Sequence, residues 1–364
     1  MTKPLAFDVF AGCGGLTLGL KQAGFRVIGA VEIDPLAVET YKLNHQRILV
    51  WPQDIRLLPA VTVARRLRLR RGQLDLLAGC PPCEGFSAIR NLNGARRIRD
   101  PRNDLVFDFL RFVRVLMPKA IMLENVPRLG KNRRFAIFCK ALSRLGYKYE
   151  YRVLNAADYG VPQRRRRLIL LASRSRTVSF AAPAVRQRTV REAIGWLPHP
   201  RKTRDALHCV KEGRSERIRD LIRRIPRNGG SRKSLGTNSQ LGCHQRCDGF
   251  KDVYGRLAWN QVAPTITSGC FNPSKGRFLH PTQNRTLTLR EAALLQSFPK
   301  TYAFSMRRGK TGAASLIGNA LPPEFVRRHA QFFFGILKKR RRRHHAHTPQ
   351  HTARKLNTQT SGRR

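Results

Sequence analysis

The stretch LAFDVFAGCGG, residues 5–15, decides the fold class. Its first six residues form a short apolar run typical of a buried strand, and the glycines that follow predict a tight turn into a helix. A glycine-rich turn at this position lets the backbone approach a ligand, while the start of the helix offers free N–H groups. We therefore expect a strand, a ligand-binding turn and a helix.

Similar units follow along the first half of the chain, where short runs rich in Val, Ile, Leu and Phe alternate with segments of helical spacing. The predicted strands are residues 5–10, 26–31, 74–78, 120–123 and 168–172, and the predicted helices are 16–23, 35–43, 105–116 and 135–145. This alternation predicts an α/β fold with a parallel, doubly wound, Rossmann-like sheet. Ligands bind at the carboxyl ends of the strands in such sheets, so we expect the chemistry there.

The composition changes at residue 174, where Arg, Gly, Pro and Asn replace regular patterning. This change predicts a smaller, loop-rich second domain. Regular patterning returns at Leu289 and Glu324, so we expect the chain to rejoin the first domain before a basic, disordered tail. The predicted division is 1–173, 174–280, 281–337 and 338–364.

The charge of the chain predicts a polyanionic partner. Lys and Arg number 71 and Asp and Glu number 22, which gives a net charge of +49. The predicted tail holds ten of the cations and no acid, so the rest of the chain still carries +39. A hydrophobic content of 41% and 28 glycines describe a folded body, which argues against a pure scaffold binder that coats nucleic acid.

The sequence contains neither a signal peptide nor an apolar stretch of about 20 residues, the length that spans a membrane. We therefore expect a soluble cytoplasmic protein with no membrane partner, associated with the nucleoid in a prokaryote. In such a compartment the eight cysteines are expected to be reduced thiols.

Acidic residues stand at the ends of the next two candidate strands. Glu32 comes 20 residues after Gly12, where a carboxylate can accept both hydroxyls of a ribose, and Asp54 can accept an adenine amino group. A dinucleotide fingerprint requires glycine at position 17, which is Thr17 here. The pattern favours an adenosine cofactor over NAD, with a plain tight turn as the alternative.

Cys80 and Cys83 form a Cys-x-x-Cys pattern after the strand predicted at 74–78. The pattern fits a redox pair, half of a zinc site completed by residues 243–247, or a nucleophilic thiol at Cys83. A buried, inert cysteine is the fourth interpretation. We favour no metal site, because a second Cys-x-x-Cys is absent from the sequence.

Charged residues also flank the last two predicted strands. Glu124 follows one of them and could serve only as a salt-bridge partner, while four arginines, residues 164–167, precede the other. Strand alternation sends Arg165 and Arg167 to one side of the sheet, so that one pair of arginines can point toward the site.

Taken together, these motifs resemble the DNA (cytosine-5) methyltransferase family and follow that family's order over residues 5–335. The matching segments are residues 10–15, 82–83, 124–126, 163–167, 290–299 and 318–323. The resemblance implies methyl transfer from S-adenosylmethionine to C5 of a cytosine flipped out of duplex DNA, through a covalent bond between Cys83 and C6. It also implies a monomer on DNA and a cognate restriction endonuclease.

The resemblance assigns roles to individual residues. The implied catalytic residues are Cys83 as nucleophile, Glu124 at N3 and the exocyclic amine, and Arg167 helped by Arg165 at O2. The implied cofactor-binding residues are Phe10, Gly12, Gly14, Gly15, Glu32, Ile33, Asp54, Ile55, Pro82 and Asn319. The implied DNA-binding residues are Ser87, Gln163 and Thr265.

Two alternatives and two departures from the family pattern remain. An RNA cytosine methyltransferase fits the excess charge, but a recognition region as long as 174–280 favours DNA. A non-catalytic relative is disfavoured because Cys83, Glu124 and Arg167 are all present. Glu84 replaces the usual glutamine beside the nucleophile and opposes its thiolate form, and Cys80 replaces a small residue without a thiol. Both departures are expected to affect the rate of methyl transfer and not the type of reaction.

Overall fold

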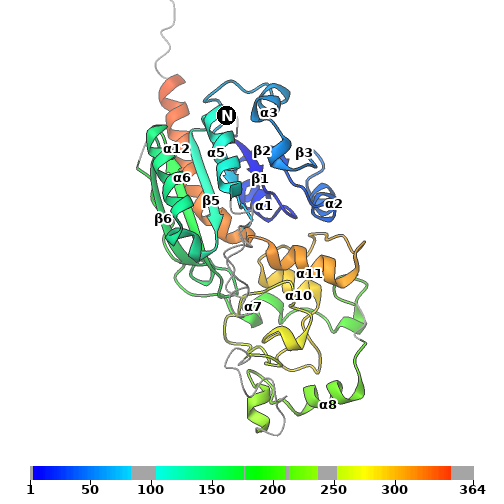
Figure 1. Cartoon of the computed structure of the whole chain (residues 1–364). Coiled ribbons are helices and arrows are strands. Elements are labelled where there is room, and N and C mark those ends of the chain that lie inside the picture. The colour runs from blue at the N-terminus through cyan, green and yellow to red at the C-terminus, as the bar shows by residue number, and fades with distance from the viewer. Residues whose placement is uncertain (1–2, 83–103, 176, 210–212, 237–251, 346–364) are drawn as a thin grey trace, which may run out of the picture.

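The computed structural model describes residues 3–82, 104–175, 177–209, 213–236 and 252–345, with side chains up to 335 (Figure 1). Its centre is a seven-stranded sheet in the order β3-β2-β1-β4-β5-β7-β6. The strands are β1 Leu5–Val9, β2 Arg26–Val31, β3 Leu49–Trp51, β4 Leu76–Gly79, β5 Ala120–Asn125, β6 Lys148–Asn155 and β7 Arg166–Ser173. The predicted α/β, Rossmann-like class is confirmed.

The prediction of a wholly parallel sheet is wrong at one edge. β1 to β5 pair in parallel, but β7 runs antiparallel to β5, and β6 runs antiparallel to β7. The cause is the connection from β6 to β7, which contains only the short 3-10 turn Ala156–Tyr159 and the loop after it. Parallel neighbours need a crossover of a dozen or more residues, so this connection makes β7 reverse direction.

Helices cover both faces of the sheet (Figure 1). α3, α5 and α6 pack on one face, and α1 and α12 pack on the other. The helices are α1 Gly15–Gln22, α2 Pro35–Asn44, α3 Ala60–Arg66, α5 Leu105–Leu116, α6 Arg133–Arg144, α7 Val190–Ile194, α8 Glu216–Arg224, α10 Leu289–Leu295, α11 Gly309–Asn319 and α12 Pro323–His345. α12 therefore extends into the segment for which a disordered tail is predicted. No helix of the described ranges is both long and apolar enough to cross a membrane.

The second part of the chain has its own apolar cluster, which joins α7, α10 and α11 to the segment around Leu257 and Phe278. The same cluster includes Cys13 and Leu36 from the first domain, so α10 and α11 bridge the two parts. α12 then returns to the sheet and packs along α1. The predicted boundary at residue 280 stays a prediction, because the helices that follow it share this second core.

Close packing of α1 on α12 gives a test of the fold. A Cβ atom on Gly19 would lie 2.5 Å from the carbonyl oxygen of Pro323 and 2.5 Å from Cβ of Val326, whereas one on Gly335 would meet nothing within 4 Å. We expect Gly19→Ala to lower the free energy of unfolding by about 1 to 3 kcal/mol through overpacking. Gly335→Ala should raise it by up to about 1 kcal/mol through helix propensity.

Urea denaturation of the parent and both variants measures these changes. A Gly19→Ala variant as stable as the parent would show that the two helices do not approach this closely. Gly335→Ala controls for the addition of a methyl group to a helix in the same helix pair.

Candidate active site

The carboxyl ends of four parallel strands lie side by side and bring the predicted site residues together. Val9 of β1 pairs with Val31 and with Gly79, and Gly79 pairs with Leu123. β7 begins at the same edge, because Leu168 pairs with Asn125. The glycine-rich turn, Glu32, the start of the cysteine loop, Glu124 and Arg167 thus lie along one edge of the sheet.

Glu124 and Arg167 form an ion pair at this edge. Nε of Arg167 lies 2.9 Å from Oε1 of Glu124, and Glu124 retains 8% of its surface exposed. Nη1 of Arg167 donates a hydrogen bond to the carbonyl oxygen of Arg166. A charged pair with so little solvent around it has a fixed geometry, because breaking it would leave a buried charge uncompensated. The carboxylate and guanidinium are thus presented together.

Asn125 ties the start of the cysteine loop to this pair. Its side-chain amide donates to the carbonyl oxygen of Pro81 at 3.0 Å, and its Oδ1 accepts from the backbone N–H of Val126. Pro82, which comes next, is exposed. The loop therefore leaves the sheet beside Glu124, although Cys83, Glu84 and Ser87 lie outside the described residues.

Cys80 is half-buried next to the same carboxylate. Burial and the negative charge of Glu124 raise the pKa of the Cys80 thiol well above its ordinary value, so Cys80 is a neutral thiol. This disfavours Cys80 as a nucleophile. The zinc interpretation involves Cys83 and residues 243–247, which the structure does not describe. Elsewhere in the described chain, no group of three or more His, Cys, Asp or Glu residues could hold a metal ion.

The glycine-rich turn has the backbone geometry that its sequence predicts. Gly12 and Gly14 have φ angles of 55° and 94°, in the left-handed region that favours glycine. A Cβ on Gly14 would lie 2.7 Å from Nε2 of His45 and 2.7 Å from the hydroxyl of Tyr302, whereas one on Gly12 would meet nothing within 4 Å. The space over Gly12 is therefore open, and Gly14 is needed for packing.

Glu32 closes over this turn from the end of β2. Its Oε2 accepts the backbone N–H of Gly12 at 2.7 Å, and its Oε1 accepts those of Ile33 and Asp34 at 2.9 and 2.8 Å. Burial raises the pKa of Glu32, and these hydrogen bonds oppose that shift. A carboxylate has about four acceptor positions, so three bonds leave capacity for a hydroxyl donor. Ile33 beside it is 60% exposed.

The remaining predicted cofactor residues have different environments. Asp54 accepts hydrogen bonds from the backbone and side chain of Arg56, and this arginine lowers the pKa of Asp54. Ile55 packs in the core, so only its backbone can face a ligand. Gly15 lies against the carbonyl oxygen of Leu321, and Asn319 is exposed at the end of α11. Phe10 has a positive φ angle of 62° and packs against the core.

Gln163, for which a contact with DNA is predicted, is buried at the junction between the two parts of the chain, and that contact stays a prediction. Gln163 has no exposed surface, and its amide nitrogen donates to the carbonyl oxygen of Leu295 and to the side chain of Gln296. Its Oε1 accepts the backbone N–H of Ile266. The side chain therefore joins the strand side of the molecule to the second part of the chain. Its position next to four arginines in the sequence gave no sign of this burial.

Arg165 and Thr265 also serve this junction. The terminal nitrogens of Arg165, which is 3% exposed, donate to the carbonyl oxygens of Ile266 and Gly318. Thr265 donates its hydroxyl proton to the carbonyl oxygen of Arg164 at 2.7 Å. The predicted alternation of the arginines is confirmed by their burial. Arg167 forms the ion pair with Glu124, and the assistance of Arg165 at O2 stays a prediction.

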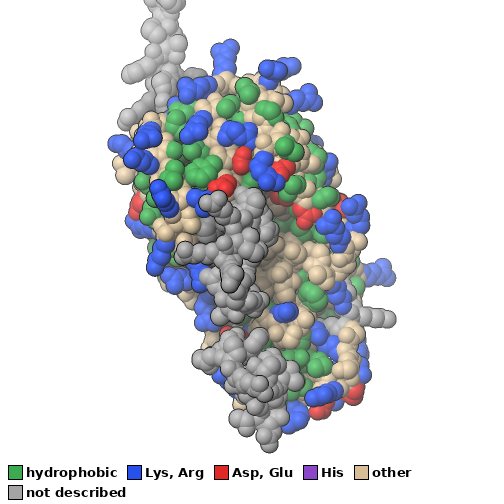
Figure 2. Space-filling view, viewed as in Figure 1, with side chains coloured by type: hydrophobic (Ala, Val, Ile, Leu, Met, Phe, Trp, Pro, Cys, Tyr) green, Lys and Arg blue, Asp and Glu red, His purple; other side chains and the backbone are tan. Residues whose placement is uncertain are grey.

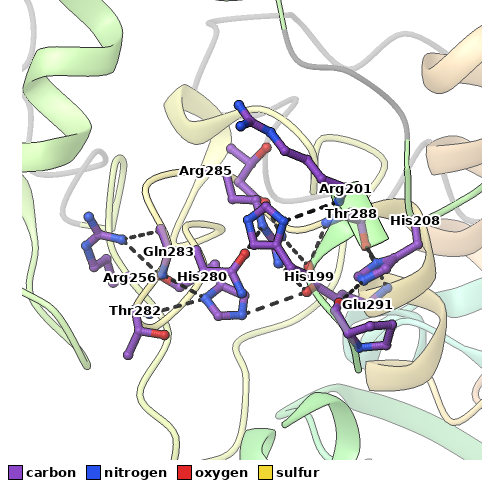
Figure 3. A network of polar contacts seen from close by, with 12 residues as sticks. His199, Arg201, His208, Arg256, His280, Thr282, Gln283, Arg285, Thr288 and Glu291 are labelled. Atoms are coloured by element: carbon purple, nitrogen blue, oxygen red, sulfur yellow. Dashed lines mark hydrogen bonds and ion pairs between the residues drawn. The ribbon is translucent and has the colours of Figure 1, made fainter. Parts of the chain in front are cut away.

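The motif at residues 290–299 contributes to a polar network in the second part of the chain (Figure 3). Glu291 is 1% exposed and accepts two hydrogen bonds of 2.7 Å from Arg285, while its carboxylate also caps α10. Arg256, which is fully buried, donates to the carbonyl oxygens of His280 and Gln283. These side chains hold the irregular loops together.

Asp8 is a buried acid next to the predicted cofactor turn that the sequence predictions did not single out. It is fully buried below the glycine-rich turn, where its Oδ2 accepts a 2.7 Å hydrogen bond from Thr17, whose hydroxyl also contacts that of Tyr41. Its Oδ1 has no hydrogen-bond partner within the described part of the chain. Burial raises the pKa of Asp8 to about 7. An acid inside an apolar run was the available signal.

Comparisons with known proteins agree with this geometry. The model of the family described as C-5 cytosine-specific DNA methylase matches residues 6–334. The chain is 33% identical to the Type II methylase M.HgiDII of Herpetosiphon aurantiacus, over 86% of this chain and 90% of that protein. It is 35% identical to the Type II methyltransferase M.XorII of Xanthomonas oryzae pv. oryzae, over 90% and 84% of the two chains.

A solved structure shows the same similarity. The crystal structure described as a DNA modification methyltransferase encoded within an E. coli prophage matches with a TM-score of 0.68 at 27% identity. The match covers 92% of this chain and all of the other. The chain therefore belongs to the C-5 cytosine-specific DNA methylase family. It is a DNA (cytosine-5) methyltransferase, and its relatives are Type II enzymes.

The raised pKa of Asp8 predicts a pH-dependent effect on stability. The pKa of Asp8 is 3.8 in the unfolded chain and about 7 in the folded protein. Between these two pH values the buried carboxyl lowers the free energy of unfolding by up to about 1.4 kcal/mol for each pH unit, and above pH 7 this loss is constant. The stability advantage of Asp8→Asn over the parent should therefore grow from pH 5 to pH 7 and then level off. Taking the difference cancels the histidines that titrate in both proteins.

Melting temperatures of the parent and of Asp8→Asn at pH 5, 6, 7 and 8 test this. A difference that stays constant over the whole range would mean that Asp8 is ionised throughout.

Proposed function

We propose that this enzyme methylates C5 of a cytosine flipped out of a specific sequence in duplex DNA, with Cys83 as the nucleophile. The observation that carries the proposal is the hydrogen bond from Asn125 to the carbonyl oxygen of Pro81, next to the ion pair between Glu124 and Arg167. This hydrogen bond holds the first residues of the nucleophile loop beside the carboxylate of Glu124 and the guanidinium of Arg167. A cytosine ring needs these groups around it for attack at C6.

The chemistry follows from the poor nucleophilicity of C5. The Cys83 thiolate forms a bond to C6, and the electron pair of the C5–C6 double bond becomes available at C5. Glu124 holds N3 and the exocyclic amine, so that N3 gains proton character as the thiolate adds. Arg167 holds O2 and stabilises the negative charge that develops on the ring. C5 would then bond to the methyl group that bound S-adenosylmethionine supplies, with the electron pair of the broken bond staying on the cofactor's sulfur. Transfer of the C5 proton to a base would restore the C5–C6 double bond and expel the thiolate of Cys83.

The turn at the end of β1 fits an adenosine cofactor, and members of this family generally use S-adenosylmethionine, which when bound supplies an electrophilic methyl group. Gly12 has open space above it, and Glu32 has acceptor capacity for a ribose hydroxyl. The exposed Ile33 offers an apolar surface to an adenine ring, and Asp54 offers an acceptor for its amino group. Pro82 and Asn319 would line the edges of the cofactor site.

A stacked cytosine cannot present C5 and C6 to a thiol and a methyl donor, so the base must leave the helix. The second part of the chain, joined to the sheet through Gln163 and Arg165, would bind the duplex while the base is out. Thr265 would contact a phosphate. We propose that the enzyme acts as a monomer beside a cognate restriction endonuclease.

Label transfer to duplex DNA and to RNA of the same cytosine content separates this proposal from an RNA methyltransferase. Bisulfite sequencing of DNA from cells that express the enzyme identifies the methylated sequence. Labelling of RNA alone would reject the DNA assignment for this chain.

Replacing the nucleophile gives the sharpest test of mechanism. We expect Cys83→Ser to abolish methyl transfer, because a serine hydroxyl is almost wholly protonated at neutral pH and cannot add to C6. Cys209→Ser is the matched control, because Cys209 is exposed and lies in the second part of the chain. Label transfer by Cys83→Ser within tenfold of the parent would reject the proposed nucleophile.

Replacing Glu32 tests the cofactor site. Glu32→Ala removes the ribose acceptor, and hydrogen bonds to charged groups contribute about 1.5 to 3 kcal/mol. We therefore expect S-adenosylmethionine to bind roughly 10 to 150 times more weakly by calorimetry. Cys83→Ser should bind it with the affinity of the parent. An unchanged affinity in Glu32→Ala would remove Glu32 from the site.

A further inference from the structure

We propose that the edge of the sheet opposite the active site binds a second segment of duplex DNA through its phosphate backbone. The proposal goes beyond methyl transfer and concerns five arginines in the last turn of α3 and the segment that follows it, which we call the arginine ridge. The ridge consists of Arg65, Arg66, Arg68, Arg70 and Arg71.

The ridge is an ordered structure. Leu67 and Leu69 are half-buried against the main core, while all five arginines are exposed. Hydrogen bonds fix the backbone, from the N–H of Arg68 to the carbonyl oxygen of Arg65 and from Gly72 to Leu116. The fold therefore fixes the backbone from which the five exposed arginine side chains project.

The charge of the ridge is not neutralised by the acids around it. The segment from Ala60 to Leu74 contains no Asp or Glu. The carboxylate that follows in the chain, Asp75, is 1% exposed, lies 2.7 Å from Nζ of Lys119 and accepts the backbone N–H of Leu5. Within the described part of the chain, no ion pair involves the ridge. Five like charges in seven residues repel one another, which favours binding of a polyanion.

Other elements place cations on the same edge. Exposed Arg114, Arg144, Lys148 and Arg174 lie at the ends of α5 and α6, at the start of β6 and after β7. Arg174 reaches the ridge, because a Cβ on Gly72 would lie 3.2 Å from its Nη2. Figure 2 shows Lys and Arg side chains along this upper rim of the molecule.

The end of α12 lies on this edge too. α12 runs alongside α1 from Gly19 in the middle of α1, which lies against Pro323, to Gly24 just after α1, which lies against Phe334. The helix continues to His345, and every residue from 338 to 343 is Lys or Arg. The end of α12 therefore comes to the same edge as the ends of α3 and α5 (Figure 1).

The edge is separate from the active site. β5 runs from Ala120 at this edge to Glu124 and Asn125 at the active edge, and six strand residues span about 20 Å. A duplex whose cytosine lies at Glu124 therefore approaches the carboxyl ends of the strands, about 20 Å from the ridge edge. Duplex DNA is the polyanion this enzyme meets, and arginine binds phosphate bidentately, so we assign the edge to a second DNA segment.

The test compares two triple variants. Arg65→Gln, Arg68→Gln and Arg70→Gln together remove three ridge charges. Lys42→Gln, Arg47→Gln and Lys140→Gln remove three exposed cations elsewhere in the first domain. Binding of a random-sequence 40-base-pair duplex is measured for each protein across a series of potassium chloride concentrations. Melting temperatures equal to that of the parent show that the variants are folded.

We expect the ridge variant to flatten the slope of log affinity against log salt by up to about 2.7, because each neutralised phosphate contributes about 0.9. The control variant should keep the slope of the parent. Equal slopes in the ridge variant and the parent would overturn the proposal, as would equal losses in both variants, which would show an effect of net charge alone.

Two further measurements identify the class of polyanion that binds the ridge and show whether the ridge affects methylation. Single-stranded RNA with the same number of phosphates and vesicles of anionic lipid replace the duplex. A loss confined to RNA or to vesicles would overturn the assignment to DNA. The methylated sequence, mapped by bisulfite, should be unchanged in the ridge variant. If the parent does not methylate DNA but the duplex slope still falls, the proposed function fails and the ridge inference stands.

Discussion

The antiparallel return of β7 against β5 is the constraint on which the rest of the structure depends. Because the connection from β6 is short, β7 starts where β5 ends, and Arg167 comes within 2.9 Å of Glu124. The residues just before this start extend into the second part of the chain, where Arg164 and Ala263 are linked by a backbone hydrogen bond. One strand start therefore completes the polar site and joins the two parts.

Buried polar contacts hold the loops of the second part of the chain together. Arg256 is fully buried, and its guanidinium donates to backbone carbonyl oxygens of α8 and of the loop after His280, together with the side chain of Asn284. A buried guanidinium costs free energy unless its donors are satisfied, so this arginine fixes the loops it bonds. Such loops can be shaped for a ligand without the periodicity of regular elements.

The sequence predicted the buried strands and amphipathic helices well, because their periodicity is local. The predicted segments 26–31 and 105–116 match β2 and α5 at both ends. β6 was missed because it is an edge strand with little apolar alternation, as in its burial pattern. The direction of β7 depends on the length of the connection from β6, and because β6 was not predicted, no such connection could be read from the sequence.

The candidate site was predicted in part for the same reason. Glu32, Glu124 and the glycine turn follow predicted strands, so a parallel sheet brings them together. The burial of Gln163 and Arg165 depends on contacts with residues about 100 or more positions away, namely Ile266, Gln296 and Gly318, which no local pattern contains.

The most direct test of the account identifies the cysteine that bonds to DNA. A long duplex synthesised with 5-fluorocytosine in place of a fraction of its cytosines traps the covalent complex, since fluorine at C5 cannot leave as a proton. Proteolysis and mass spectrometry then locate the nucleotide adduct. The account predicts an adduct on Cys83 that forms only with S-adenosylmethionine present. An adduct on Cys80, or methylation without any adduct, would contradict it.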